Sequence, residues 1–205
     1  MKNLKRIAAQ GFSLCLVAIS LSMCTNRPTW SSEEEALIHE TPNTKMRLCT
    51  INEEQDSLFL RQQCQPLTKE DITAPTFEEL KKRMLLTVTD PDNEGVGIAA
   101  PQVGISRQLV AVQRLDKEGS PFEFYVNPRL THLSEEKQNG WEGCLSIPDE
   151  RGEVPRSSWI VVEYNEPTTF DLKCDTVKGF TAIIFQHETD HLNGILYIDK
   201  AVSMK

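Results

Sequence analysis

The sequence predicts an α+β domain in which antiparallel β-sheets pack around a C-terminal central helix. Two observations carry this prediction. β-rich segments separated by turn residues follow one another from residue 109 onward, and an apolar helical pattern comes after them at 180–191. The length of 205 residues, with 39% hydrophobic and 25% charged residues, suits one globular domain and excludes coiled-coil rods and low-complexity polymers.

Apolar spacing predicts two principal helices, and a third, short helix fits residues 32–39. The first principal helix follows Pro75, has Thr76 as its expected N-cap and ends at Asp90-Pro91. Its apolar positions are Phe77, Leu80, Met84, Leu85 and Val88. The second ends at the expected C-cap Gly194. One face of that helix holds Phe180, Ile183, Ile184, His187 and His191.

Four strands are expected, at 109–112, 122–126, 159–164 and 170–174. The residues between the last two strands, 165–168, are typical of a hairpin loop. No internal repeat interrupts this order.

The net charge argues against one class of partner. With 22 Lys and Arg against 30 Asp and Glu, the chain carries −8 at neutral pH. This is the wrong sign for a surface that wraps a phosphate backbone, so no nucleic-acid partner is expected.

The first 24 residues have the layout of a secretory signal peptide. A basic start is followed by an uncharged apolar run over 11–23, which is too short for a comfortable transmembrane helix. The segment Leu21-Ser22-Met23-Cys24 is similar to a bacterial lipobox, in which the cysteine is acylated and becomes the first mature residue. Met23 departs from the small residue usual at that place.

This leader divides the chain into three parts. We expect a signal peptide over 1–24, a flexible polar tether over 25–45 and a globular domain over 46–205. An acylated Cys24 places the protein in the cell envelope, lipid-anchored or periplasmic. A true start codon downstream places it in the cytoplasm instead.

The chemistry is concentrated in Gln186-His187-Glu188-Thr189-Asp190-His191. Histidines at i and i+4 lie on one face of a helix, so both imidazoles can reach one metal ion, and Glu188 can act as a base toward water. Thermolysin-like peptidases take a third ligand from a downstream Glu, and none follows His191. Metzincins use a third His where this chain has Tyr197.

The third ligand must therefore come from upstream, because a catalytic ion of this kind takes three protein ligands. Cys144 is the best candidate, since a thiolate binds metals strongly and the preceding Gly143 allows close approach. The rivals are Cys174, Cys64, Cys49 and His132.

Three segments resemble, in order, the three motifs of the peptide deformylase family: residues 95–102 (GVGIAAPQ), 142–146 (EGCLS) and 186–192 (QHETDHL). The resemblance runs from near Ile51 to Asp199. It implies hydrolysis of the N-formyl group from formyl-methionyl peptides, which releases formate and a free amine. Two further classes stay open as alternatives, an envelope metallopeptidase and a non-catalytic peptide-binding lipoprotein.

The resemblance also implies a role for each motif. It places one divalent metal ion on Cys144, His187 and His191. Glu188 takes the water proton and passes it to the leaving amine, while the Gln102 side-chain amide and the Leu145 backbone N–H stabilise charge on the formyl oxygen. Family resemblance suggests Fe(II) as the native ion, with Zn(II) or Ni(II) able to substitute.

The remaining expectations concern the substrate. By resemblance, Gly97 lets its loop pair with an extended peptide. The methionine pocket is lined by Phe180, Ile183 and Ile184, for which plain core packing is an equal alternative. The partners expected are N-formyl-methionyl peptides, and the protein is expected to be a monomer.

Overall fold

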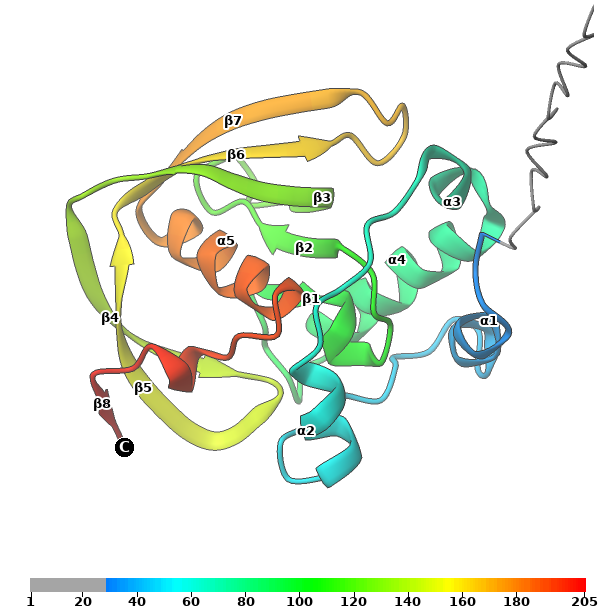
Figure 1. Cartoon of the computed structure of the whole chain (residues 1–205), viewed down its shortest axis with the longest axis horizontal. Coiled ribbons are helices and arrows are strands. Elements are labelled where there is room, and N and C mark those ends of the chain that lie inside the picture. The colour runs from blue at the N-terminus through cyan, green and yellow to red at the C-terminus, as the bar shows by residue number, and fades with distance from the viewer. Residues whose placement is uncertain (1–28) are drawn as a thin grey trace, which may run out of the picture.

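A computed structural model describes residues 29–205, and the leader expected over 1–24 lies outside these residues. Among the helices of the described part, none combines the length and the apolar character needed to cross a bilayer. Two antiparallel sheets enclose the helix α5 (Gly179–Leu192), as Figure 1 shows. This arrangement confirms the expected α+β class with a central helix near the end of the chain.

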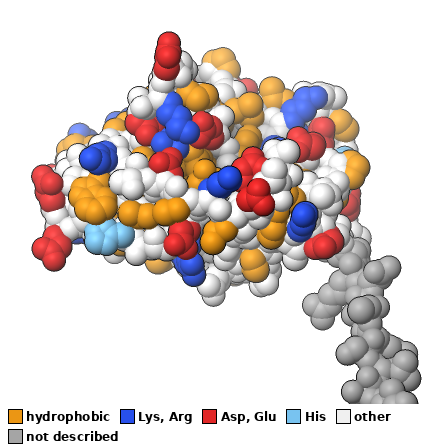
Figure 2. Space-filling view, turned by 90° about the horizontal axis from the view of Figure 1, so that it is seen from above, with side chains coloured by type: hydrophobic (Ala, Val, Ile, Leu, Met, Phe, Trp, Pro, Cys, Tyr) orange, Lys and Arg blue, Asp and Glu red, His pale blue; other side chains and the backbone are white. Residues whose placement is uncertain are grey.

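The larger sheet has the strand order β1-β2-β3-β6-β7. Its strands are β1 (Gly97–Ala99), β2 (Leu109–Gln113), β3 (Phe122–Leu133), β6 (Trp159–Asn165) and β7 (Leu172–Lys178). The smaller sheet consists of β4 (Lys137–Cys144), β5 (Ile147–Ser157) and β8 (Ser203–Met204). Seen from the side of β6 and β7, acidic and basic side chains are intermingled over the surface with apolar side chains between them (Figure 2).

The expected strands at 109–112, 122–126 and 159–164 are confirmed as parts of β2, β3 and β6. The fourth is displaced, because β7 starts only at Leu172 and continues to Lys178. Phe170 has a positive φ of 66°, which ends the hairpin loop and cannot continue a strand. Sequence patterning missed β1, β4, β5 and β8.

The helix α4 (Pro75–Val88) confirms the first principal helix. Its expected N-cap is wrong: Ala74 caps the helix, and Thr76 lies inside it. Pro75 explains the shift, since its fixed φ and missing N–H suit the first helical position. The buried Thr76 hydroxyl donates instead to the Glu35 carboxylate at 2.8 Å.

The expectation of a flexible tether is wrong for residues 29–45. The short helix that fits residues 32–39 is confirmed as α1 (Ser32–His39), which begins with a complete capping box between Ser31 and Glu34. Trp30 is only 2% exposed and Ile38 is fully buried, so the segment is packed into the domain. Two further short helices, α2 (Glu54–Leu60) and α3 (Lys69–Thr73), precede α4.

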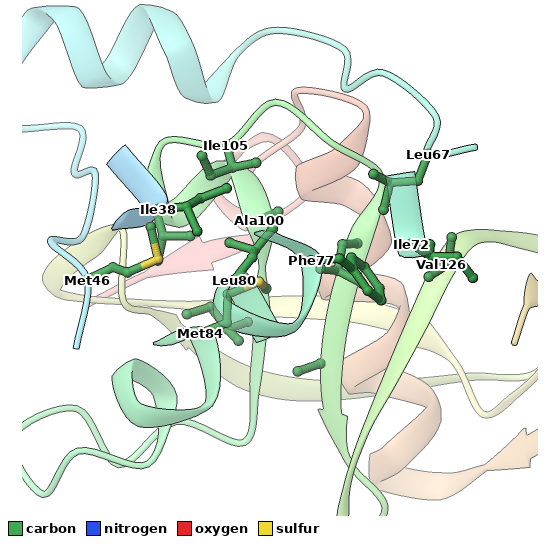
Figure 3. Close-up of a cluster of buried hydrophobic side chains, with 14 of the residues drawn as sticks. Ile38, Met46, Leu67, Ile72, Phe77, Leu80, Met84, Ala100, Ile105 and Val126 are labelled. Atoms are coloured by element: carbon green, nitrogen blue, oxygen red, sulfur yellow. The ribbon is translucent and has the colours of Figure 1, made fainter. Parts of the chain in front are cut away.

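One apolar cluster joins these N-terminal helices to the larger sheet (Figure 3). It includes Ile38 of α1, Leu80 of α4 and Ala100 of the 3-10 turn η1 (Ala100–Val103). Because η1 follows directly on β1, this cluster fixes one wall of the site described below.

The central helix α5 is buried on most of its circumference, as expected for a helix enclosed by two sheets. Its C-cap is Asn193, and Gly194 follows in the left-handed conformation with φ 70°. A Cβ at Gly194 would collide with the Arg61 carbonyl oxygen, so this close contact also requires glycine. The helix ending expected at Gly194 is confirmed within one residue.

Candidate active site

The end of β4 and the last two turns of α5 bring three metal-ligating side chains together. The Sγ of Cys144 and ring nitrogens of His187 and His191 all lie within 4.8 Å of one another. The Sγ of Cys144 is 3.3 Å from Nε2 of His191. The structure therefore groups the HExxH histidines with Cys144, the upstream candidate favoured by the sequence.

The four rival ligands lie elsewhere. His132 is exposed on β3 and stacks on Trp159 with 4.7 Å between ring centroids. Cys49 and Cys64 are buried free thiols, and Cys174 is exposed on β7. None of these four belongs to the cluster formed within residues 29–205.

The electrostatics of Cys144 suit a metal ligand. Burial alone would raise the pKa of its thiol, but the charge of His191 and hydrogen bonds from both histidines outweigh burial and hold the pKa well below its ordinary value. A thiolate is the ligand form of cysteine, and one thiolate with two imidazoles suits Fe(II) or Zn(II). The residues present thus fit a bound divalent ion.

His187 is oriented by a second carboxylate. Its Nδ1 lies 2.9 Å from Oε2 of Glu142, which leaves Nε2 available to a metal ion. Arg156 donates to both oxygens of Glu142, at 2.8 and 3.0 Å. Burial would raise the pKa of Glu142, but the bonds from His187 and Arg156 lower it to about 2.

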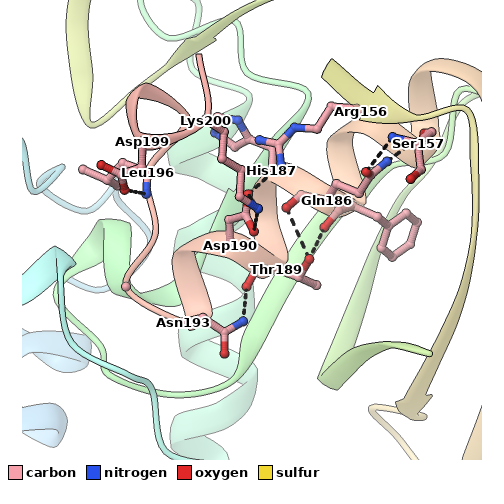
Figure 4. A network of polar contacts seen from close by, with 12 residues as sticks. Arg156, Ser157, Gln186, His187, Thr189, Asp190, Asn193, Leu196, Asp199 and Lys200 are labelled. Carbon is pink, nitrogen blue, oxygen red and sulfur yellow. Dashed lines mark hydrogen bonds and ion pairs between the residues drawn. The ribbon is translucent and has the colours of Figure 1, made fainter. Parts of the chain in front are cut away.

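Ion pairs connect Arg156 to further charged residues near the end of α5 (Figure 4). Arg156 also donates to Asp190 at 2.5 Å, and Asp190 accepts from Lys200 at 2.6 Å. Gln186 exchanges two hydrogen bonds of 2.9 Å with the Ser157 backbone and so ties α5 to β5. Arg156 is therefore a buried partner of two acids.

Sequence reasoning gave Glu142 no role in the site. It left Arg156 between a contact to the substrate peptide and pairing with an acid, and the structure shows the pairing. A signal for Glu142 existed, since metal-bound histidines generally donate their second nitrogen to a carboxylate or carbonyl. Glu142 lies two residues before Cys144 on β4, and its carboxylate contacts His187 of α5. Its pairing with a distant Arg could not be found without the register of β4 and β5.

Glu188 follows His187 on α5 and is only 4% exposed. Among the described residues its Oε2 has no hydrogen-bond partner, and the side chain lines the same cleft as Cys144. Burial raises the pKa of its carboxyl to about 7. An unpartnered carboxylate with this pKa can exchange a proton near neutral pH.

Gln102 presents its donor end to the site. Its Oε1 accepts from the Ala99 N–H at 2.8 Å, which fixes the orientation of the side-chain amide. Nε2 consequently faces Sγ of Cys144 at 3.5 Å and Oγ of Ser146 at 3.3 Å. Leu145 lies in the two-residue turn between β4 and β5 and also lines the cleft.

The cleft has a volume of about 680 Å³. Its apolar wall contains the three predicted pocket residues Phe180, Ile183 and Ile184. Ile183 and Ile184 are buried, but Phe180 is 55% exposed, so plain core packing does not describe this residue.

Gly97 also lines the cleft, on β1 at the edge of the larger sheet. A Cβ at this position would collide with the Glu188 carboxylate and would lie 2.7 Å from Cγ2 of Ile184. Glycine is thus required here by the close approach of α5.

We therefore expect Gly97→Ala to displace Glu188. The predicted result is a fall in kcat of roughly 100-fold, the scale of a misplacement near 1 Å, with bound metal retained. Steady-state kinetics together with elemental analysis check this. The control is Gly140→Ala, because a Cβ at Gly140 meets open space. Full activity of Gly97→Ala would contradict the close approach.

Fold and site together are those of a metal-dependent hydrolase, in which a thiolate and two imidazoles fit one divalent ion. Residues 46–205 match the family model described as polypeptide deformylase. The chain belongs to the peptide deformylase family. Over 154 residues it is 35% identical to the peptide deformylase of Leptospira biflexa, a match that covers 72% of this chain and 84% of that protein.

Solved structures of peptide deformylases have a similar fold. The class I type b peptide deformylase of Acinetobacter baumannii, solved with Met-Ala-Ser bound, is similar with a TM-score of 0.67 and 32% identity over 77% of this chain and 99% of that one. The peptide deformylase of Thermotoga maritima gives a TM-score of 0.67 with 31% identity over 78% and 99% of the two chains. These findings give no support to the metallopeptidase or the non-catalytic alternative.

Proposed function

We propose that the cleft removes the formyl group from formyl-methionyl peptides with Cys144, His187 and His191 as metal ligands and Glu188 as the proton carrier. The observation that carries these roles is the convergence of the three ligands beside a buried, unpartnered carboxylate. A divalent ion held there supplies a Lewis acid that lowers the pKa of water and polarises a carbonyl.

Glu188 accepts a proton from the attacking water and delivers it to the leaving amine. Its burial supports this role, because a carboxyl with a pKa of about 7 is poised between the two protonation states at neutral pH. The products are formate and a free amino terminus.

Gln102 and Leu145 stabilise the negative charge that develops on the formyl oxygen. The fixed amide of Gln102 supports this assignment, because its Nε2 faces the ligand Cys144 without needing to rotate. Each donor of this kind is typically worth roughly 100- to 1000-fold in rate.

The peptide binds in extended form along β1. Support comes from the position of β1, which pairs with β2 on one side and stands at the edge of its sheet on the other. An extended peptide can add to such an edge by backbone hydrogen bonds. The binding of Met-Ala-Ser to the A. baumannii relative is consistent with a peptide substrate.

The apolar wall selects methionine. We expect formyl-Met peptides to be processed faster than matched formyl-Gly peptides by roughly 10- to 100-fold in kcat/KM, since burying such a side chain is worth about 1.5–3 kcal/mol. Rate measurements on formyl-Met-Ala and formyl-Gly-Ala check this. Equal rates on the two would show that Phe180, Ile183 and Ile184 are only packing residues.

Product analysis tests the function. The metal-loaded protein is incubated with a formyl-Met pentapeptide, and the products are identified by mass spectrometry. The expected result is loss of the formyl group alone, with every internal peptide bond intact. Internal cleavage would indicate a peptidase, and an unchanged peptide would rule out both activities.

Fe(II) is proposed as the native ion, with Zn(II) or Ni(II) as substitutes. In an oxidising compartment a thiolate-bound Fe(II) is vulnerable to oxidation, and a redox-inert ion avoids this. Activity of the Zn(II) form that persists in air supports such a substitution.

We further propose that Cys24 is acylated and anchors the protein in the cell envelope. The lipobox-like sequence before Cys24 supports this. Fractionation of the native host is expected to place the wild type in membranes and Cys24→Ala in the soluble fraction. A soluble wild-type protein whose sequence starts near Met46 would contradict the proposal.

A further inference from the structure

The helix α1 lies upstream of residues 46–205, the part that matches the family model. It is nevertheless firmly attached to the domain. Glu34 accepts from Nε and Nη2 of Arg107 at 2.6 and 2.7 Å, and Arg107 also donates to the Thr29 carbonyl oxygen at 3.0 Å. The guanidinium lies 5.0 Å from the ring centroid of the buried Trp30.

The other end of α1 is held by a second buried cation. Arg83 of α4 donates from Nη1 to the carbonyl oxygens of Leu37 at 2.8 Å and Ile38 at 2.7 Å. The last carbonyls of a helix lack partners within the helix, so this guanidinium satisfies them. Both ends of α1 are therefore fixed relative to the core.

Between these attachments, α1 packs on the turn that carries Gln102. Ile38 belongs to the same buried cluster as Ala100 and Ile105, which flank Gln102 (Figure 3). Leu37 lies so close to Gly104 that a Cβ at Gly104 would be 2.9 Å from its Cδ2. Through Leu37 and Ile38, α1 thus packs against η1 and the residues that follow it.

Both the backbone and the side chain of Gln102 are held by hydrogen bonds at this turn. Its backbone carbonyl accepts from the Cys49 N–H at 2.8 Å, and its amide is fixed by Ala99. A shift of the η1 backbone would therefore carry the Gln102 amide with it, away from Cys144 and Ser146.

We infer that Leu37 and Ile38 are positioning residues for Gln102. Through them, a segment outside the family-matched region holds the donor at the place where the formyl oxygen develops charge. The inference rests on the proposed role of Gln102. Its test must therefore distinguish a failure of the positioning role from a failure of the proposed role of Gln102.

A double-mutant cycle in the full chain provides that test. Ile38→Ala is compared with the wild type, and the same change is made in a Gln102→Ala background, with metal content matched in all four proteins. We expect Ile38→Ala to lower kcat roughly 10- to 100-fold with KM little changed. In the Gln102→Ala background it should have almost no further effect, because the group that it displaces is absent.

The matched control is Ile72→Ala, which removes the same atoms from the other side of the same cluster. It should lower thermal stability as Ile38→Ala does and leave kcat unchanged. Equal losses of kcat from Ile38→Ala in both backgrounds, or a loss of stability alone, would overturn the inference.

Two measures keep the test decisive. Leu37→Ala, a change at a partly exposed residue, replaces Ile38→Ala if the latter fails to fold. Hydrogen exchange of the Gly104 amide, which is bonded to the Pro101 carbonyl oxygen at 3.1 Å, is followed without any substrate. Faster exchange in Leu37→Ala supports the inference and unchanged exchange contradicts it, whereas an inactive wild type would contradict only the proposed function.

Discussion

Cys144→Ala is expected to lose bound metal and deformylase activity together. Two imidazoles hold a divalent ion poorly, and Cys144 supplies the only negatively charged ligand of the three. Loss of an outer hydrogen-bond partner typically costs roughly 10- to 100-fold in metal affinity, and loss of a ligand should cost far more. Elemental analysis after dialysis, paired with formate release, measures both effects on one sample.

The control for this change is Cys174→Ala, which alters an exposed thiol on β7 away from the cleft. It should keep full metal content and activity. Stoichiometric metal in Cys144→Ala would show that another residue supplies the third ligand.

Glu188→Gln is expected to separate chemistry from metal binding. The amide preserves the size of the side chain beside Gly97 but cannot accept the water proton, so kcat should fall roughly 100- to 10,000-fold. Metal content should stay at the wild-type level, because Glu188 is not one of the three clustered ligands. The same pair of measurements distinguishes this outcome from that of Cys144→Ala.

Glu53→Gln serves as a control, since this glutamate is exposed ahead of α2 and outside the cleft. This variant should match the wild type in both kcat and metal content. Near-normal turnover by Glu188→Gln at full metal occupancy would assign proton transfer to a different group.

The active-site helix could be predicted because its signals are local. Apolar spacing and the HExxH pattern lie within one continuous segment, and the face of α5 that the spacing indicated lines the cleft with Phe180, Ile183, Ile184 and His187. Cys144 could be proposed from its residue type and its motif. The distance between Cys144 and His191 could not be predicted, because this distance depends on how β4 packs against α5.

The strands β4 and β5 escaped prediction for a physical reason. They contain glycines, prolines and several charged residues, among them Gly140, Pro148 and Pro155, which weaken strand patterning. Their stability comes from pairing with each other, from the bonds between Gln186 and Ser157 and from the buried Arg156. Gln186 is 29 residues from Ser157 in the sequence, so local patterning does not show this contact.

The segment 29–45 was misjudged because its composition is acidic and polar. Its attachment depends on two side chains, Trp30 and Ile38, and on cations contributed by distant residues, Arg83 and Arg107. Such pairings cannot be found from local periodicity. They also explain how a segment with few apolar residues can be part of the core.

The most direct test of the proposed site is a titration of the metal-free protein with Fe(II) under anaerobic conditions, with formate release from a formyl-Met peptide as the readout. Activity should rise in proportion to bound iron and level off at one ion per chain, the capacity of the cluster of Cys144, His187 and His191. A protein that binds one ion per chain at this cluster and still releases no formate would contradict the proposed function.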